Sequence, residues 1–334
     1  MRRYCILFVL ISVLIFQCQS VEARLIRVPA QFNSIQNAID NSDDGDTVLV
    51  DRGRYSERIN FNGKSIFVTS NYTFTEDEED IIETIIDGGI EEGSRVVIRS
   101  GEDAVLTGFT ITGGRTDYGG GIYCRSSTAI FSHLIVEGNT VERNGAGIYC
   151  TRNSNVLIHD VIIRENSAGY VGGAFSCFGG SDVTMRNVLI YNNECDHVGG
   201  ALHCYGAELT LENVTIFRNY APHSGGALYL TAAGSAQINN SILWNNAPHE
   251  IYLMTGNDST HLEVYFSDVD GGLDEIVDVD GSQVDWGTGN IDSDPLFVDA
   301  ANGDYRLTDY SPAIGAGTAA GAPSKDIDDN IRPN

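Results

Sequence analysis

Lysine is nearly absent from this sequence of 334 residues, which contains only Lys64 and Lys325. The chain has 20 basic and 46 acidic side chains, and its formal net charge is −26 at pH 7. A surface of that charge repels nucleic acids and anionic membranes, so neither is expected as a partner. It also repels acidic polysaccharides unless cations lie between the two.

Long hydrophobic runs are also lacking, except for one near the N-terminus. Residues 5–16 are mostly apolar, Arg2 and Arg3 precede them, and Val21-Glu22-Ala23 follows as a cleavage site. The run is shorter than the roughly 20 apolar residues of a membrane-spanning helix. The pattern predicts a secretory signal peptide over residues 1–23 and no membrane span. We therefore expect a secreted, extracellular or cell-surface protein, with the periplasm as an alternative.

Two short sequence phrases repeat every 26 or 27 residues in the centre of the chain. The first begins with glycine followed by glycine or alanine, and it covers residues 119–124, 145–150, 172–177, 199–204 and 225–230. The second is an apolar stretch that ends at an asparagine, namely Asn139, Asn166, Asn193, Asn219 and Asn246. A fixed period of this length is typical of a solenoid, in which each coil buries its apolar side chains against its neighbours.

In both phrases, apolar positions that face inward alternate with positions that face outward, which indicates strands rather than helices. The inward positions of the second phrase hold β-branched residues or leucine in nearly every copy, such as Val161 and Ile163. Those of the first phrase include Cys124, Cys150, Cys177 and Cys204, which we expect to form a buried stack of thiols rather than a metal site. The predicted fold is all-β, a right-handed parallel β-helix whose asparagines stack at one bend.

Three segments are expected along the chain. After the signal peptide, residues 24–266 form the β-helix, which begins with a short capping helix over residues 34–39 that covers the open strand edges. Residues 267–334 form an irregular, acidic C-terminal tail that packs over the last coil as a cap. The acidic run at residues 76–80 is expected to be a solvated loop, because like charges repel one another.

Aromatic side chains recur at two outward positions of the repeat. The first aromatic column consists of Tyr123, Tyr149, Tyr229 and Tyr252, interrupted by Ser176 and His203. The second aromatic column consists of Tyr191, Phe217 and Trp244, with the apolar residues Ile135, Ile162 and Leu189 beside it. Coils stack about 4.8 Å apart, so each column would form a flat strip that can stack on sugar rings. We predict that both columns, His203 included, bind carbohydrate; alternatively, like residues on adjacent strands only stabilise one another.

A polar column follows four residues after each asparagine position and comprises Tyr118, Arg143, Tyr170, His197 and His223. Elimination at a uronate needs a base and a cation that stabilises the developing negative charge. Arg143, Tyr170, His197 and His223 are therefore the candidate catalytic residues, with Glu194 and Asp196 nearby in the sequence. The alternative is a hydrogen-bonded turn beside the glycine pairs.

Two pairs of carboxylates precede glycines in the C-terminal tail. Asp268 with Asp270 and Asp278 with Asp280 resemble the spacing of calcium loops, although neither pair fits the twelve-residue EF-hand pattern. Calcium is thus the cofactor that the sequence suggests, and a solvated acidic tail is the alternative.

Three stretches of the chain resemble known families. Residues 34–39, 45–47 and 53–57 look like the first coil of pectate-lyase-like β-helix proteins, which include pectin methylesterases. The glycine-led repeats are similar to those of polymorphic outer-membrane autotransporter proteins, and residues 290–314 resemble the C-terminal segment of secreted choice-of-anchor β-helix proteins. These resemblances imply a β-helix and export. In choice-of-anchor proteins the chain usually continues beyond an Asp-rich motif toward an anchor. We do not expect such an anchor within the present sequence.

The catalytic motifs of the related enzymes are not found. Pectin methylesterases carry Gln-Asp-Thr and Asp-Phe-Ile-Phe-Gly segments, and polygalacturonases carry Gly-His-Gly and Arg-Ile-Lys. The sequence therefore favours a secreted or cell-surface protein that binds a polysaccharide or surface glycan without cleaving it. A polysaccharide lyase or hydrolase is the first alternative, and a structural or adhesive surface module is the second.

Overall fold

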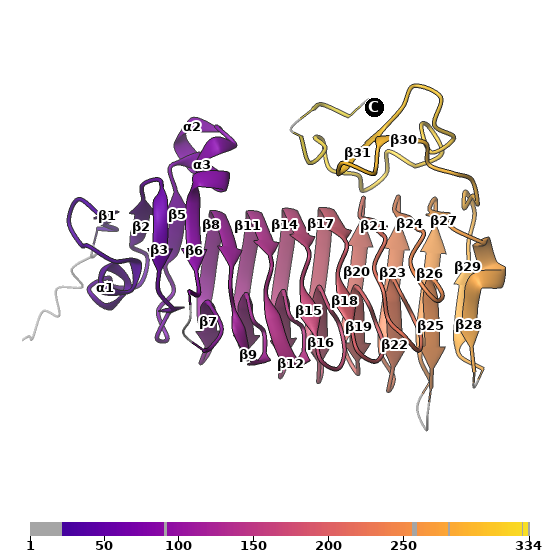
Figure 1. Ribbon diagram of the computed structural model, residues 1–334, viewed down its shortest axis with the longest axis horizontal. Coiled ribbons are helices and arrows are strands. Elements are labelled where there is room, and N and C mark those ends of the chain that lie inside the picture. Colours follow the sequence, from indigo (N-terminus) through magenta and orange to yellow (C-terminus); the bar gives the residue numbers. More distant parts are fainter. Residues whose placement is uncertain (1–21, 90–91, 256–258, 280, 329, 333–334) are drawn as a thin grey trace, which may run out of the picture.

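The chain forms a parallel β-helix of about 10 turns with a few short helices (Figure 1). The computed structural model describes residues 22–89, 92–255, 259–279, 281–328 and 330–332. The predicted signal peptide therefore lies almost entirely outside the described residues, as does Asp280. The predicted all-β solenoid is confirmed.

The first sheet has 16 strands and runs the length of the molecule. Its main path consists of β1 (Leu25–Val28), β2 (Thr47–Val50), β5 (Phe67–Ser70), β8 (Asp103–Thr112), β11 (Thr128–Glu137), β14 (Asn155–Arg164), β17 (Asp182–Tyr191), β20 (Glu208–Glu212), β23 (Ser235–Asn239), β26 (His261–Tyr265) and β29 (Gln283–Trp286). The side branches are β3 (Gly53–Ser56), β6 (Thr84–Asp87), β21 (Thr215–Phe217), β24 (Ile242–Trp244) and β27 (Asp268–Val269). The ten-residue strands β8, β11, β14 and β17 form its centre.

A second parallel sheet runs beside the first, and a short third sheet is present in four of the coils. The second sheet contains β4 (Ile59–Asn60), β7 (Val96–Arg99), β10 (Ile122–Arg125), β13 (Ile148–Thr151), β16 (Phe175–Phe178), β19 (Leu202–Tyr205), β22 (Leu228–Thr231), β25 (Ile251–Met254) and β28 (Ile276–Asp278). The short third sheet contains β9 (Arg115–Tyr118), β12 (Thr140–Asn144), β15 (Ser167–Ala168) and β18 (Glu194–Cys195). The coil stacking continues past the boundary expected at residue 266, since β28 pairs with β25 and β29 with β26.

The interior is a continuous apolar core made from the predicted inward columns. Val161 and Ile163 are fully buried, and the four cysteines of the first phrase lie in register on neighbouring strands of the second sheet. All of these cysteines are buried, as predicted, and their thiols are free. Burial raises the pKa of the Cys150 and Cys177 thiols, so they remain protonated and behave as small apolar side chains.

The predicted asparagine stack is present as a buried ladder along the coils. Each side-chain Nδ2 donates to the Oδ1 of the next asparagine, at 3.0 Å for Asn139 to Asn166 and 2.9 Å for Asn166 to Asn193. The same amide also donates to backbone carbonyls at the bend, as Asn193 does to Ile163 and Tyr191. The ladder therefore satisfies buried backbone groups at the same place in every coil.

The turn that joins the third sheet to the second requires the glycine pairs. Gly172 has a φ of +65°, which favours a residue without a Cβ. A Cβ on Gly173 would lie 2.4 Å from the carbonyl oxygen of Glu194, which no side chain tolerates. The two glycines thus have different reasons to recur.

Short helices lie at the N-terminal end and beside the first sheet. The capping helix is present as α1 (Ile35–Asp40), with Ser34 as its N-cap. The acidic run is an exposed loop over residues 76–78, as predicted, between helices α2 (Tyr72–Thr75) and α3 (Glu79–Glu83), and its last two residues begin α3. Arg52 pairs with Asp77, Asp80 and Glu83, which neutralises part of the run and allows Asp80 to be buried.

The C-terminal tail does not cap the last coil as expected. After the 3-10 helix Gly272–Glu275 and β29, it turns back along the outside of the first sheet (Figure 1). There it forms an antiparallel hairpin of β30 (Phe297–Asp299) and β31 (Asp304–Leu307). Its aromatic side chains contact the rings of the middle coils, as Tyr305 does with Tyr191 and Phe297 with Phe217, while β28 and β29 pair with the last coil.

Candidate functional site

Each long strand of the first sheet bends at one residue with a positive φ. The bend column comprises Gly108, His133, Asp160, Asn187, Asn213, Asn240 and Phe266. In β11 the bend resets the alternation, because Phe131 and Leu134 both face the core although they are three residues apart. Asn, Asp and His are the residues that tolerate this left-handed conformation best after glycine. From His133 to Asn240, the bend thus places one polar side chain per coil on the outer face.

A groove of about 1130 Å³ lies on the outer face of the first sheet, along these bends. Its floor consists of outward side chains of the central strands, including Thr110, Ile135, Glu137, Ile162, Arg164 and Leu189. Helices α2 and α3 form one wall with Tyr72, Glu78, Ile81 and Ile82. The returning tail forms the other wall with residues 302–307, Asp326, Asp328 and Arg332. Both walls stand on the same side of the β-helix in Figure 1.

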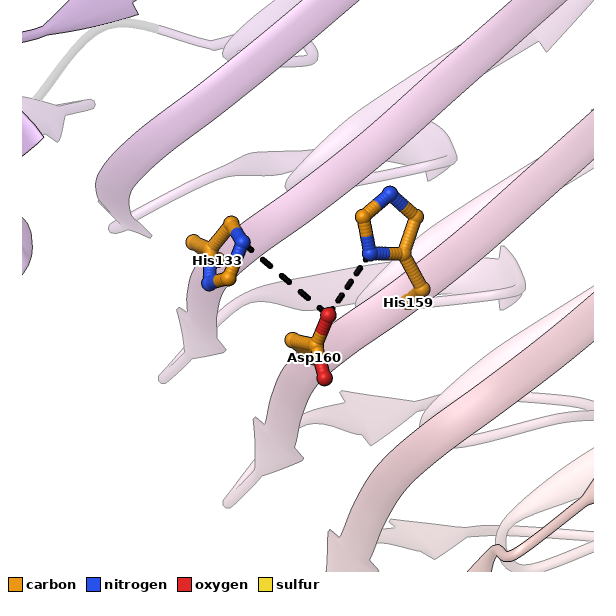
Figure 2. Close-up of side chains that lie close together, drawn as sticks. All are labelled: His133, His159 and Asp160. Atoms are coloured by element: carbon orange, nitrogen blue, oxygen red, sulfur yellow. Dashed lines mark hydrogen bonds and ion pairs between the residues drawn. The ribbon is translucent and has the colours of Figure 1, made fainter. Parts of the chain in front are cut away.

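Three titratable side chains meet at the bends of β11 and β14 (Figure 2). His159 Nδ1 lies 2.7 Å from Asp160 Oδ2, and His133 Nε2 lies 3.9 Å from the same oxygen. The side chains are 20 to 31% exposed, so each can be reached from solvent. Burial alone would raise the pKa of Asp160, but hydrogen bonds with His159 and Asn187 and the charges of both imidazoles lower it below its ordinary value. Asp160 is therefore an anionic acceptor beside two imidazoles.

Contacts from both walls hold this cluster in place. The Tyr72 ring of α2 packs on His133 with the ring centroids 4.6 Å apart. Asn187 Nδ2 donates to Asp160 Oδ1 at 2.9 Å and to the backbone carbonyl of Lys325 at 2.9 Å. Arg332 in turn donates to Asn187 Oδ1 at 2.9 Å. The tail is thus connected to the carboxylate of Asp160 through one buried amide.

The groove contains paired charges and a short apolar strip. Arg164 donates to Glu137 Oε2 and to the Tyr191 hydroxyl, both at 2.7 Å. Arg54 pairs with Asp87 and Arg306 with Asp304. The apolar strip consists of Ile135, Ile162 and Leu189, which lie in register on β11, β14 and β17. The groove therefore offers polar groups at its bends and an aliphatic floor between them.

The first aromatic column has the predicted register but not the predicted exposure. Tyr149, His203 and Tyr229 are buried, whereas Tyr123 and Tyr252 are half-buried. The turn before each glycine pair covers the column, since Val171 and Val198 pack on Tyr229. Burial also lowers the pKa of His203 to about 3. The prediction of a flat strip open to sugars is wrong for this column, because alternation gives the direction of a side chain and not what lies over it.

The second aromatic column is covered by the C-terminal tail. Tyr305 lies 4.7 Å from Tyr191 and 5.2 Å from Phe217 between ring centroids, and Phe297 contacts Phe217 at 5.3 Å. Tyr191 and Phe217 are buried as a result, and Trp244 is half-buried. The prediction of an exposed strip is wrong for Tyr191 and Phe217, because these two rings pack against the chain's own tail. The neighbouring residues Ile135, Ile162 and Leu189 line the groove instead.

The polar column forms a stack of rings beside the third sheet. Tyr170 and His197 have ring centroids 4.8 Å apart, as have His197 and His223. Arg143 donates to the Tyr118 hydroxyl at 3.1 Å. None of these residues lines the groove described above. Their catalytic role stays a prediction.

The predicted calcium residues lie on two different sheets. Asp268 in β27 is buried, and its Oδ2 has no hydrogen-bond partner among the described residues. Burial and the nearby charges of Asp292, Asp270 and Asp294 raise the pKa of Asp268 to about 6. Asp278 in β28 accepts hydrogen bonds from the backbone of residues 281 and 282. Calcium binding stays a prediction, and Asp280 lies outside the described residues.

The His133, His159 and Asp160 cluster was missed by the sequence analysis, although a signal for it exists. The bend column lies six residues before each ladder asparagine, so His133 and Asp160 precede Asn139 and Asn166 by the same interval. The break in alternation between Phe131 and Leu134 marks the bend.

Comparison with known proteins supports the fold. The sequence matches the family described as right handed beta helix region over residues 54–206 and 94–269. A crystal structure of pectate lyase Pel9A superposes with a TM-score of 0.58 at 17% identity, covering 91% of this chain and 94% of that chain. A pectin methylesterase mutant in complex with a hexasaccharide gives a TM-score of 0.36 at 10% identity, covering 86% of this chain and 98% of the other. No curated protein matches the chain. Among the described residues, no helix is long and apolar enough to cross a membrane.

Proposed function

Because the chain belongs to the right-handed β-helix family, we propose that it is an exported protein that binds a polysaccharide in the groove between helices α2–α3 and the C-terminal tail. The observation that carries this proposal is the in-register apolar strip of Ile135, Ile162 and Leu189 on the groove floor. In this proposal the groove, and not the predicted aromatic columns, is the surface that contacts the polysaccharide, since most rings of those columns are buried.

The apolar strip and the polar groups around it suit a sugar chain. Neighbouring coils present one aliphatic side chain about every 4.8 Å, on which the apolar faces of successive sugar rings can lie. Glu137, Arg164 and Asp160 offer donors and acceptors for hydroxyl groups at the edges of the strip. A concave site with an apolar floor and a few fixed polar groups is typical of a ligand pocket.

The charges of the groove favour a neutral polysaccharide over a polyuronate. Three of the arginines that line the groove, Arg54, Arg164 and Arg306, each have a carboxylate partner, and the fourth, Arg332, donates to Asn187. The carboxylates of Glu78, Asp326 and Asp328 also line the groove. A polyanion would therefore meet little uncompensated positive charge on a protein with a net charge of −26.

Binding of neutral and acidic oligosaccharides by calorimetry, together with pull-down on insoluble glycans, tests this proposal. The double variant Ile135→Ala/Ile162→Ala should weaken binding by roughly tenfold or more, because it removes apolar contact area. Ile242→Ala is a matched control, since Ile242 occupies the equivalent position on β24, outside the groove. Equal loss in both variants, or no glycan bound by the wild type, would overturn the groove as the binding site.

Cleavage of the bound chain is the second candidate function. It is favoured by the His159–Asp160 pair, in which His159 Nδ1 lies 2.7 Å from a carboxylate oxygen of Asp160, a residue that lines the groove. Such a pair can act as a general acid or base toward a nearby sugar. Release of reducing ends, or of unsaturated ends that absorb at about 235 nm, would distinguish cleavage from binding alone. Loss of that activity in His159→Gln with retained binding would assign it to the pair.

A further inference from the structure

We infer that His133, His159 and Asp160 form a binding site for a divalent transition metal ion of the zinc type on the floor of the groove. The three ligand atoms lie within 4.8 Å of one another. The inference stands whether or not the groove binds a glycan, because it depends only on this cluster and its supports.

The distances fit a single ion with a small adjustment. Zinc bonds of about 2.0–2.1 Å to nitrogen and oxygen place two tetrahedral ligands about 3.3 Å apart. The observed separations from Asp160 Oδ2 are 2.7 Å to His159 Nδ1 and 3.9 Å to His133 Nε2, one below and one above that value. Side-chain rotations that shift the ligand atoms by about 0.6 Å would bring both separations to that value.

The backbone fixes the directions of the ligands before any ion binds. His133 and Asp160 occupy equivalent bends, between the register pairs Ser132 with His159 and Leu134 with Val161. Both have left-handed backbone conformations, with φ of 48° and 55°. Two adjacent parallel strands therefore hold the three side chains on one edge, which lowers the entropy cost of assembling a site.

Residues around the cluster hold the ligand side chains in position by hydrogen bonds and packing, as residues around known metal ligands do. Asn187 holds Asp160 Oδ1 at 2.9 Å and leaves Oδ2 toward the imidazoles, while Arg332 fixes Asn187. The Tyr72 ring packs on His133 and restricts its rotation. Hydrogen bonds and packing of this kind set ligand orientation and raise metal affinity.

The donor set selects the class of metal. Two imidazole nitrogens and one carboxylate oxygen suit zinc and its neighbours in the first transition row, whereas calcium and magnesium prefer oxygen ligands alone. Since three protein ligands leave at least one position for water or substrate, and His133 and Asp160 line the groove, that position would face the groove.

A second cluster provides a matched control on the same sheet. His261 Nε2 lies 3.1 Å from Asp285 Oδ2 and 3.5 Å from Glu263 Oε1, near the C-terminal end of the solenoid. It has one imidazole instead of two, and it is not part of the groove lining. It therefore reports how much zinc an exposed acidic cluster of this protein binds without a second nitrogen ligand.

Zinc titration of the chelator-treated mature protein by calorimetry, with cobalt absorption as a spectroscopic readout, tests the inference. We expect one zinc ion per chain, and a cobalt spectrum of tetrahedral type. His133→Asn, which keeps a residue suited to the bend, and His159→Gln should each weaken zinc binding by roughly tenfold or more. His261→Gln should leave it unchanged.

Thermal unfolding separates loss of the site from loss of the fold. Zinc should raise the melting temperature of the wild type and of His261→Gln, because a ligand that binds only the folded state stabilises it. It should not raise that of His133→Asn or His159→Gln, although both should unfold cooperatively in its absence. The inference would be overturned if the wild type bound no zinc, or if zinc binding were unchanged in both His133→Asn and His159→Gln. Loss of zinc binding in His261→Gln would also overturn it.

Discussion

The carboxyl group of Glu250 accepts two hydrogen bonds from Asn246, one from the backbone nitrogen at 2.8 Å and one from Nδ2 at 2.7 Å. Asn246 is the last asparagine of the ladder, so Glu250 occupies the place that the next asparagine Oδ1 would fill. The ladder therefore ends on an ionisable group that is almost completely buried.

Glu250 should make the stability of the β-helix depend on pH. Burial raises the pKa of Glu250 from 4.5 to about 8, against the lowering effect of its hydrogen bonds with Asn246. A carboxyl group whose pKa is raised in the folded state favours folding fully below pH 4.5, and this contribution is lost as the pH rises through about 8. We expect the wild type to lose roughly 5 kcal/mol of unfolding free energy between these limits. Glu250→Gln should abolish this part of the pH dependence in thermal unfolding, and an unchanged pH profile would contradict it.

Removal of one asparagine from the ladder should destabilise the protein strongly. The Asn193 side chain donates to Ile163, Tyr191 and Asn219 and accepts from Asn166, all in the buried bend. Asn193→Ala leaves these groups unsatisfied and should cost about 2–5 kcal/mol. Asn155→Ala, at an exposed position of β14, should change the free energy of unfolding by less than about 0.5 kcal/mol. Similar effects of both substitutions in denaturant titrations would show that the ladder contributes little.

The C-terminal tail should be held on the β-helix chiefly by Tyr305. This ring contacts Tyr191, Phe217 and Phe297, so Tyr305→Ala removes the centre of an aromatic cluster. Limited proteolysis should then cleave the tail faster than in the wild type while the coils stay intact. Tyr310→Ala is the control, because that side chain is 89% exposed on the same tail. Equal cleavage rates in the two variants would mean that other contacts fix the tail.

The buried thiols should not react with thiol reagents in the folded protein. Burial raises the pKa of Cys195 to about 12 and that of Cys150 and Cys177 as well, so thiolate is scarce and out of reach. Ellman's reagent should label the five described cysteines only after denaturant is added. Cys177→Ala should be tolerated better than Cys177→Ser, because serine buries a hydroxyl group in an apolar column. Rapid labelling of the native protein would indicate that the coils open.

The repeat was sufficient to predict the fold, because one period determines both the inward columns and the stacking. Val161, Ile163 and the cysteines were assigned correctly to the core, and Asn193 to a ladder between coils. Each of these assignments depends only on neighbouring coils. Local alternation therefore contains the information for them.

The surface could not be predicted in the same way, because it depends on segments far apart in the sequence. Tyr191 has the pattern of an exposed ring, yet Tyr305 covers it from more than a hundred residues away. The groove exists only because the tail returns and α2–α3 project beside the same strands. For the His133 and Asp160 cluster, in contrast, the bend column did contain a signal in the spacing from the ladder.

The residues of the bend column can determine what the surface binds, while other residues form the core of the β-helix. One residue per coil points outward at a fixed spacing, while the core positions on either side of it are apolar in most coils, except for the buried Ser241 and Ser267. Substitutions among Asn, Asp, His and Gly at the bends should therefore alter what the surface binds with little cost to the core. Asn187 and Asn240 already use the column differently from His133 and Asp160, since they hold the tail through Lys325 and Thr318. The column is a linear array of exchangeable positions, through which a single scaffold can acquire new ligands one coil at a time.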